Sequence, residues 1–359
     1  MTKIDWYILR KFIGTFIYSL LILLVISVVI DITEKVDDFI KYHIPLRDVI
    51  VDYYFGFIPH IAALLFPLFI FISVIFFTSK MAYRSEIIAI LSAGVSFRRF
   101  LRPYWVGAIL FGTILWLANY WVVPNANRKR TYFENNRIRT PDNQQSQYNR
   151  TSRIDSFTYV TFGSYDPNYR SGSNFTLEKV SGQHVRYRLK ADRISWDSTG
   201  KAWRLDYVTV RTMEGLKETW ISKQDTVLKI ALVPKDLIEE KNLQEAMTTP
   251  DLRKYIKRES IRGSEGLNTY WVEYYRRTAA AGAVVILSLI GGIIAARKVR
   301  GGSGLHLALG IVVSASYIIL MQFTTVFSVK ANLDPLMAVW IPNVLFGSIA
   351  LYLYRRAPK

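Results

Sequence analysis

Cysteine is absent from this chain of 359 residues, so it can form no disulfide, no catalytic thiol and no thiolate metal site. The histidines, at positions 43, 60, 184 and 306, are scattered along the sequence, which argues against a metal centre. The phosphate-binding pattern G-x-x-x-x-G-K-[ST] is missing, and so are the H-E-x-x-H and G-x-S-x-G motifs. We therefore expect a non-catalytic chain with no metal and no cofactor of its own.

Charged residues are missing from six long hydrophobic stretches: Phe12–Ile30, Tyr53–Phe77, Pro103–Asn127, Thr278–Ala296, Gly301–Val329 and Pro335–Tyr354. A helix needs about 20 apolar residues to cross a hydrocarbon core of about 30 Å, and each stretch is long enough. The first exceeds a signal-peptide core of about 7–15 residues, so we expect it to be retained as a helix. The sequence predicts a polytopic α-helical membrane protein with six transmembrane helices, three before and three after a polar insert.

Acidic residues are scarce on one predicted side of the membrane. If the N-terminus is cytoplasmic, the segments 1–11, 78–102, 297–300 and 355–359 face the cytoplasm, and their only acids are Asp5 and Glu86. Lys and Arg are abundant in these segments, whereas acids outnumber bases in 31–52. This positive-inside bias predicts cytoplasmic termini and an insert on the opposite side. Much of the net charge of +18 is thereby explained by topology, and nucleic acid is not expected as a partner.

The insert, residues 125–275, separates helices of 1–124 from those of 276–359. Glycines divide it into short segments rich in aromatic and β-branched residues, which predicts strands. These segments are Ser156–Phe162, Asn174–Val180, Val185–Trp196, Ala202–Met213, Glu218–Ser222 and Thr226–Ile230. Residues 134–152 are polar and are expected to be a loop, and Thr249 with Pro250 begins a predicted helix. We expect an all-β insert, a sandwich, jelly roll or open barrel, that ends in helical segments.

The cytoplasmic segment between spans two and three has a pattern of its own. A helix is predicted over about 79–93, capped at its start by Thr78 or Ser79. Its apolar residues Ile87, Ile90 and Leu91 recur at helical spacing, and Gly94 suits a left-handed C-terminal cap. The pattern indicates a short amphipathic helix that lies against the cytoplasmic face of the membrane.

The segment Arg84-Ser-Glu-Ile-Ile-Ala-Ile-Leu-Ser-Ala-Gly-Val-Ser96 resembles the cytoplasmic coupling-helix motif of the lipopolysaccharide-export permeases, the LptF/LptG family. The residues at matching positions are Ser85, Glu86, Ala93, Gly94 and Ser96. Residues 5–12, 298–310 and 333–343 are similar to the family's opening, its glycine-rich turn and its approach to span six. The resemblance covers the whole chain.

This resemblance implies an exporter that extracts lipopolysaccharide from the bacterial inner membrane and passes it to periplasmic jelly-roll bridge proteins. The insert would be a periplasmic jelly roll, and a sister six-span permease would complete the pair. A separate ABC-type ATPase dimer, which uses ATP and Mg, would bind the coupling helix. The coupling residues implied are Arg84, Ser85, Glu86, Ala93, Gly94 and Ser96, with Glu86 paired to a base of the ATPase.

Bases near the outer ends of the spans are the candidates for binding the anionic lipid: Lys35, Lys41, Arg276 and Arg277. Ordinary interfacial anchoring explains such residues equally well. The chain departs from the family pattern here, because acids surround Lys35 where relatives are often more basic, and Ala280 stands where proline is common. Two other functions stay open. An ion-coupled secondary transporter is disfavoured because no span has a central acid, and a membrane-anchored periplasmic scaffold or sensor needs neither six spans nor a coupling helix.

Overall fold

The computed structural model describes residues 2–138, 147–155, 157–182, 184–215, 217–230, 232–237, 243–262, 266–297 and 304–356. The chain forms two compact units. The membrane unit comprises Met1–Thr131, Gln244–Arg253 and Asn268–Lys359, and the β unit comprises Tyr132–Leu243 and Lys254–Leu267. Residues 244–253 and 268–275 thus belong with the membrane helices, although the sequence placed them in the insert.

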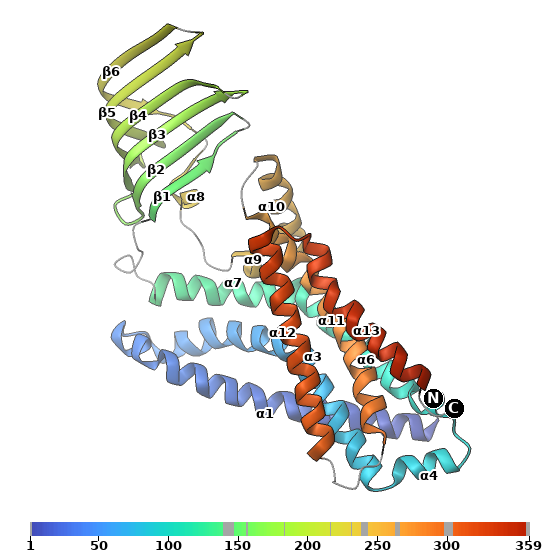
Figure 1. Ribbon diagram of the computed structural model, residues 1–359. Helices are drawn as coiled ribbons and strands as arrows, with labels where there is room; N and C mark the ends of the chain where they lie inside the picture. Colours follow the sequence, from blue (N-terminus) through green and yellow to red (C-terminus); the bar gives the residue numbers. More distant parts are fainter. Residues whose placement is uncertain are drawn as a thin grey trace. The chain divides into compact units, whose positions relative to one another are not determined.

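Among the described residues, six runs of helix are long and apolar enough to cross a membrane, which confirms the predicted spans (Figure 1). The first half contains α1 (Lys3–Lys41), α2 (Leu46–Asp48), the π-helical turn η1 (Val49–Tyr54), α3 (Phe55–Tyr83), α4 (Glu86–Ser92), α5 (Phe97–Phe100), α6 (Arg102–Leu117), η2 (Ala118–Val122), α7 (Val123–Phe133) and η3 (Glu134–Ile138). The second half contains α11 (Leu267–Ala295), α12 (Gly304–Ala331) and α13 (Pro335–Arg356).

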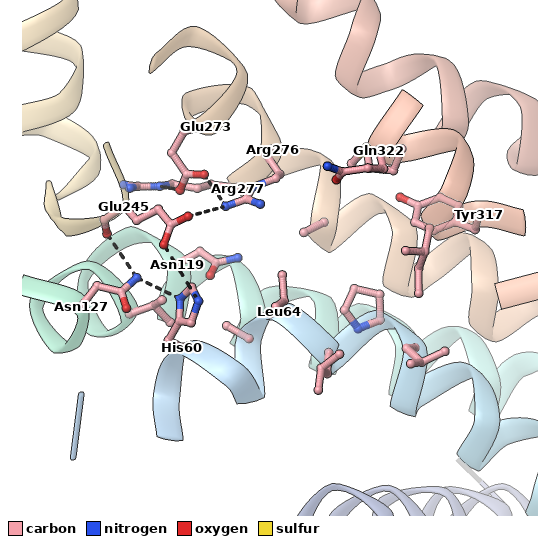
Figure 2. A pocket seen from close by; sticks show the side chains of 18 of the residues that line it. His60, Leu64, Asn119, Asn127, Glu245, Glu273, Arg276, Arg277, Tyr317 and Gln322 are labelled. Carbon is pink, nitrogen blue, oxygen red and sulfur yellow. Dashed lines mark hydrogen bonds and ion pairs between the residues drawn. The ribbon is translucent and has the colours of Figure 1, made fainter. Parts of the chain in front are cut away.

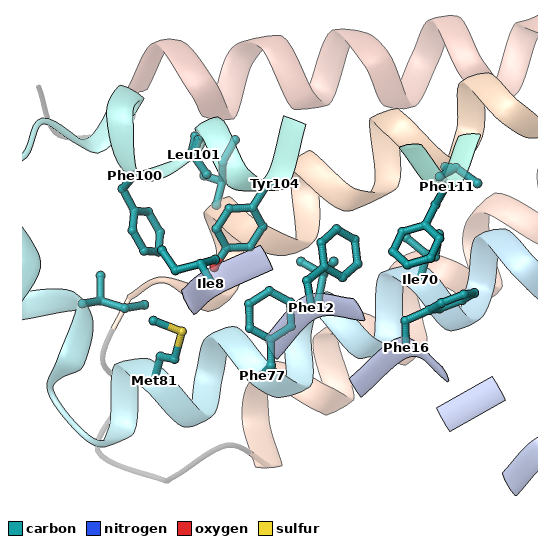
Figure 3. Packing of buried hydrophobic residues seen from close by; sticks show 14 of the residues in the cluster. Ile8, Phe12, Phe16, Ile70, Phe77, Met81, Phe100, Leu101, Tyr104 and Phe111 are labelled. Carbon is teal, nitrogen blue, oxygen red and sulfur yellow. The ribbon is translucent and has the colours of Figure 1, made fainter. Parts of the chain in front are cut away.

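Aromatic side chains hold the first three spans together (Figure 3). The ring of Phe12 on α1 lies 5.6 Å from that of Phe77 on α3 and 5.3 Å from that of Phe111 on α6, centroid to centroid. A Cβ atom at Gly107 would lie 2.5 Å from a ring carbon of Phe12. The missing side chain at Gly107 therefore allows α6 to approach α1 closely.

The β unit contains one six-stranded antiparallel sheet whose strands follow chain order, β1 to β6 (Figure 1). The strands are β1 (Gln147–Arg153), β2 (Thr158–Asp166), β3 (Ser171–Ser181), β4 (His184–Asp197), β5 (Ala202–Glu214) and β6 (Lys217–Leu228). The short helices α8 (Pro234–Leu237), α9 (Leu243–Ala246) and α10 (Thr249–Arg262) follow. The inserted β domain is confirmed. Within the described residues its strands form one sheet in the order of a meander, and not the two packed sheets of a sandwich or jelly roll that the sequence analysis included among its alternatives.

Two strand predictions were wrong in detail. The predicted loop 134–152 contains η3 and most of β1, because antiparallel pairing with β2 satisfies the β1 backbone whatever its side chains. The two short strands predicted after Gly215 are one continuous strand, β6, along β5. The core of the β unit lies around Trp203, which is fully buried beside Phe162 and Tyr165.

Candidate functional site

The coupling segment is formed by α4 and the turns on either side of it. Contrary to the predicted helix over 79–93, α3 continues to Tyr83, and α4 begins only at Glu86. Ser85 adopts φ +59°, a left-handed conformation that breaks the helix, and Ser85 rather than Thr78 or Ser79 is the residue before the first turn. The left-handed cap predicted at Gly94 is confirmed, with φ +85°. The coupling helix therefore has seven residues between two left-handed turns.

One face of α4 packs inward, as its apolar spacing predicted. Ile87 is buried, and Ile90 and Leu91 pack against the aromatic cluster of the membrane unit. The opposite face is exposed and consists of small residues beside one large apolar side chain, Ile88, which is 48% exposed. Of the residues implied by the resemblance, Arg84, Ala93, Gly94 and Ser96 are exposed, and Ser85 and Glu86 are half-buried. Most of the expected coupling residues thus form one accessible surface.

Glu86 is bound within the chain. Its carboxylate accepts hydrogen bonds from the Lys11 ammonium at 2.9 and 3.3 Å and from the Tyr7 hydroxyl at 3.1 Å. Both donors lie on α1, more than 70 positions earlier in the sequence. The Lys11 ammonium also lies 4.2 Å from the centre of the Tyr7 ring. The pairing of Glu86 with a base of an ATPase stays a prediction.

The two lysines proposed for lipid binding lie at the far end of α1. Lys35 is 3.7 Å from the Asp31 carboxylate and also donates to the hydroxyl of Tyr53. Asp31 accepts hydrogen bonds from Tyr53 at 2.8 Å and from Tyr54 at 3.1 Å, so this acid organises the contact between α1 and η1. Lys41 is exposed beside Tyr42. One of the acids that flank Lys35, Asp31, therefore offsets the positive charge of its ammonium group.

The two arginines on α11 differ sharply in their surroundings (Figure 2). Arg277 is 5% exposed and donates to Glu273 at 3.0 Å. It also donates to the hydroxyl of Thr249 at 2.8 Å and to the carbonyls of Gln244 at 3.1 Å and Met247 at 2.9 Å. These bonds use most of the guanidinium's donors, so Arg277 fastens residues 244–249 to α11.

Both arginines line a cavity, but Arg276 is less enclosed by protein. Its guanidinium donates to Glu273 at 2.5 Å and lies 4.0 Å from Glu245, yet its side chain remains 37% exposed. Glu245, on α9, also lies 3.9 Å from the imidazole of His60. Burial raises the pKa of the Glu245 carboxyl above its usual range, although nearby Arg276 opposes the shift. The negative charges of the carboxylates and the positive charges of the arginines thus offset one another at this end of the cavity.

The cavity has a volume of about 200 Å³ and lies among α3, η2, α7, α9, α11 and α12 (Figure 2). Its polar end is formed by His60, Asn127, Glu245 and Arg276, with the Asn127 amide donating toward His60 at 3.0 Å. Its other walls are mainly apolar side chains such as Leu64, Pro67, Leu287, Tyr317 and Met321. A hydrocarbon chain with a polar group at one end matches this lining.

Sequence reasoning did not assign a role to Asn127 or Glu245 and predicted only that His60 is interfacial or inward-facing. The signal available for Asn127 was weak, because it is one of three asparagines in the second half of an uncharged span. No sequence pattern pointed to Glu245, because its contacts arise only when residues 244–253 pack against the membrane helices. Within the described residues there is no group of three or more His, Asp or Glu that could hold a metal ion.

A sequence model of one family, the lipopolysaccharide export system permease LptF/LptG, matches residues 6–356. Among curated proteins none matches the chain. The family match spans nearly every element described above, from α1 to α13, and includes the β unit. The chain therefore belongs to the LptF/LptG family of lipopolysaccharide export permeases.

Proposed function

We propose that this lipopolysaccharide-export permease of the inner membrane is the transmembrane subunit of an ATP-driven exporter. The observation that carries the proposal is the short helix α4, which lies between two membrane spans and leaves one face uncovered. The permease itself is non-catalytic. A separate ABC-type ATPase dimer, using ATP and Mg, supplies the energy, and a sister six-span permease completes the export path. In this proposal both termini are cytoplasmic and the β unit is periplasmic.

The exposed face of α4 is the proposed docking surface for the ATPase. Small residues such as Ala89, Ser92 and Ala93 allow close approach of a partner, and Ile88 supplies an apolar anchor. Exposed arginines at 84, 98 and 99 flank this surface and favour an acidic partner surface. The buried stripe holds α4 on the membrane unit, so a force on the docking surface acts on the spans.

Replacing Ile88 with Asp is expected to reduce recovery of the ATPase with the tagged permease by roughly tenfold or more, because it places a charge in the apolar centre of the interface. Recovery is measured by mild-detergent affinity purification and mass spectrometry. The matched control is Ile4→Asp on α1, where the side chain is 41% exposed, and it should leave recovery unchanged. If the wild-type chain purifies without any ATPase, the proposal fails.

For the lipid, Arg276 is a better proposed ligand than Arg277. Both arginines line the cavity, but the side chain of Arg276 is 37% exposed, whereas hydrogen bonds to Thr249, Gln244 and Met247 occupy the guanidinium of Arg277. The apolar cavity wall suits an acyl chain, and Lys41 at the exposed end of α1 is available to a phosphate. Lys35 contributes only if its contact with Asp31 is loosened.

Transfer to a periplasmic bridge is proposed to occur along β6. This strand is an edge of the sheet and is exposed along nearly its whole length, including Trp220 and Val227. An edge strand offers unpaired backbone groups to which a strand of another β domain can add. The partner proposed is a jelly-roll bridge protein that adds a strand of its own to β6.

A photo-reactive amino acid at Trp220 should therefore give an adduct with a jelly-roll bridge protein in intact cells. The matched control is position 169, where Tyr169 is 81% exposed in the turn between β2 and β3. We expect little or no adduct there, because the turn has no open strand edge. Equal adducts at both positions, or adducts at 169 alone, would contradict the use of β6.

A further inference from the structure

We propose that Lys11 is a positioning residue that ties the coupling helix to the first span through Glu86, so that movement of α4 is passed to α1. The inference rests on the proposed function, because it assumes that an ATPase acts on α4. Lys11 lies on α1, outside the motif of residues 84–96, and that motif assigns it no role. The inference also gives Glu86 a partner within the chain, on α1.

The contact between the two helices is specific in its geometry. One ammonium, that of Lys11, reaches both oxygens of Glu86, and the Tyr7 hydroxyl donates to one of them. Tyr7 and Lys11 are four positions apart on α1, so both side chains lie on one face of that helix. The ring of Tyr7 lies beneath the ammonium and adds a cation–π contact. Three groups from two helices thus form one polar cluster.

The coupling helix needs such a tie because its own attachment is slight. It has seven residues and buries only Ile87 fully. Ser85 and Gly94, at its two ends, have left-handed backbone conformations, where the chain changes direction. A helix this short between two turns can shift as a unit. Glu86 gives it a polar contact with α1, a helix remote in sequence.

The first span is suited to carry that shift across the membrane. It is one uninterrupted helix of 39 residues, from Lys3 to Lys41. Lys11 and Asp31 are twenty positions apart, which corresponds to roughly 30 Å along a helix axis. At the Asp31 end, α1 is bound to Tyr53 and Tyr54 of η1. A displacement of α1 at Lys11 therefore also moves Asp31, and with it the polar contact between α1 and η1 at the opposite end of the helix.

The partial exposure of Lys11 and Glu86 fits a role of their contact in transport and not in folding. The side chains of Lys11 and Glu86 are 30% and 24% exposed, and ion pairs open to solvent contribute little to stability. The pair therefore adds little to the stability of the surrounding helices. Its loss is expected to change coupling far more than folding.

The test is a charge exchange in the complete exporter, with Lys11→Glu, Glu86→Lys and the double variant. Two quantities are measured: ATPase recovered with the permease, and ATP-driven lipopolysaccharide release from proteoliposomes. Each single variant should reduce release by roughly tenfold while ATPase recovery stays near wild type. The double variant restores an opposite-charge pair and should recover most of the release, which a merely local defect would not do.

Arg10→Glu is the matched control, since Arg10 is exposed on the neighbouring position of α1 and the charge change is identical. It should leave release unchanged. If the single variants lose the ATPase and the double variant does not recover it, Glu86 pairs with the ATPase and the inference is overturned. Unchanged release in both single variants also overturns it. Failure of the wild-type chain to recover an ATPase would instead refute the proposed function.

A second measurement does not depend on how the charge variants fold. The natural chain contains no cysteine, so Lys11→Cys with Glu86→Cys introduces one defined pair of thiols. If α1 and α4 move together, joining the pair with a short reducible bis-thiosulfonate linker leaves ATP-driven release intact. If release stops on linking and returns on reduction, the two helices must separate during transport. That result would overturn the inference that they move as one.

Discussion

Arg277→Ala is expected to destabilise the membrane unit by about 3–5 kcal/mol, because it breaks a buried ion pair and leaves the Glu273 carboxylate with Arg276 as its remaining arginine partner. It also removes the donors to the carbonyls of Gln244 and Met247, which hold residues 244–249 on α11. The result should be a clearly lower melting temperature in detergent, followed by intrinsic tryptophan fluorescence.

Two companion variants show whether the loss of stability comes from breaking the ion pair between Arg277 and Glu273. Arg277→Met combined with Glu273→Leu removes both charges and should recover much of the lost stability, since replacing a whole buried pair with apolar groups is often close to neutral. Arg276→Ala should have a smaller effect because that side chain is 37% exposed. A normal melting temperature for Arg277→Ala, together with lost lipopolysaccharide release, would instead identify Arg277 as a lipid ligand.

Trp203→Ala is expected to destabilise the β unit by about 3–5 kcal/mol through the cavity it leaves. Trp203 is fully buried, and its ring lies 5.1 Å from that of Trp196. Its indole N–H donates to the carbonyl of Leu232 at 2.8 Å, and this acceptor would lose its partner. The expected readout is rapid cleavage within residues 147–237 during limited proteolysis.

Trp220→Ala is the matched control for this prediction, because the same residue type is removed from a position that is 60% exposed. It should change stability by no more than about 0.5 kcal/mol. Since the β unit has its own core, Trp203→Ala should leave ATPase recovery through α4 near wild type. Equal protease sensitivity of both variants would show that Trp203 does not anchor this core.

Several features of the protein followed from its sequence alone. The six uncharged stretches predicted the membrane spans, because an apolar run of sufficient length has no other stable environment. The alternating residues of 185–194 lie in β4, and Gly94 occupies the left-handed position predicted for it. These properties depend on local periodicity or on the backbone preference of one residue, and both can be read without knowing what packs nearby.

The tertiary structure decided what local patterns do not encode. Ser85 breaks the predicted coupling helix although serine has no strong preference for positive φ, and the polar segment 147–153 became β1 because β2 lies beside it. Two adjacent arginines on α11 differ in their surroundings, since Arg277 is bound to residues 244–249 and Arg276 remains partly exposed. The Lys11–Glu86 contact joins residues 75 positions apart. Such contacts arise only when the helices pack, so long-range packing determined the details of the site.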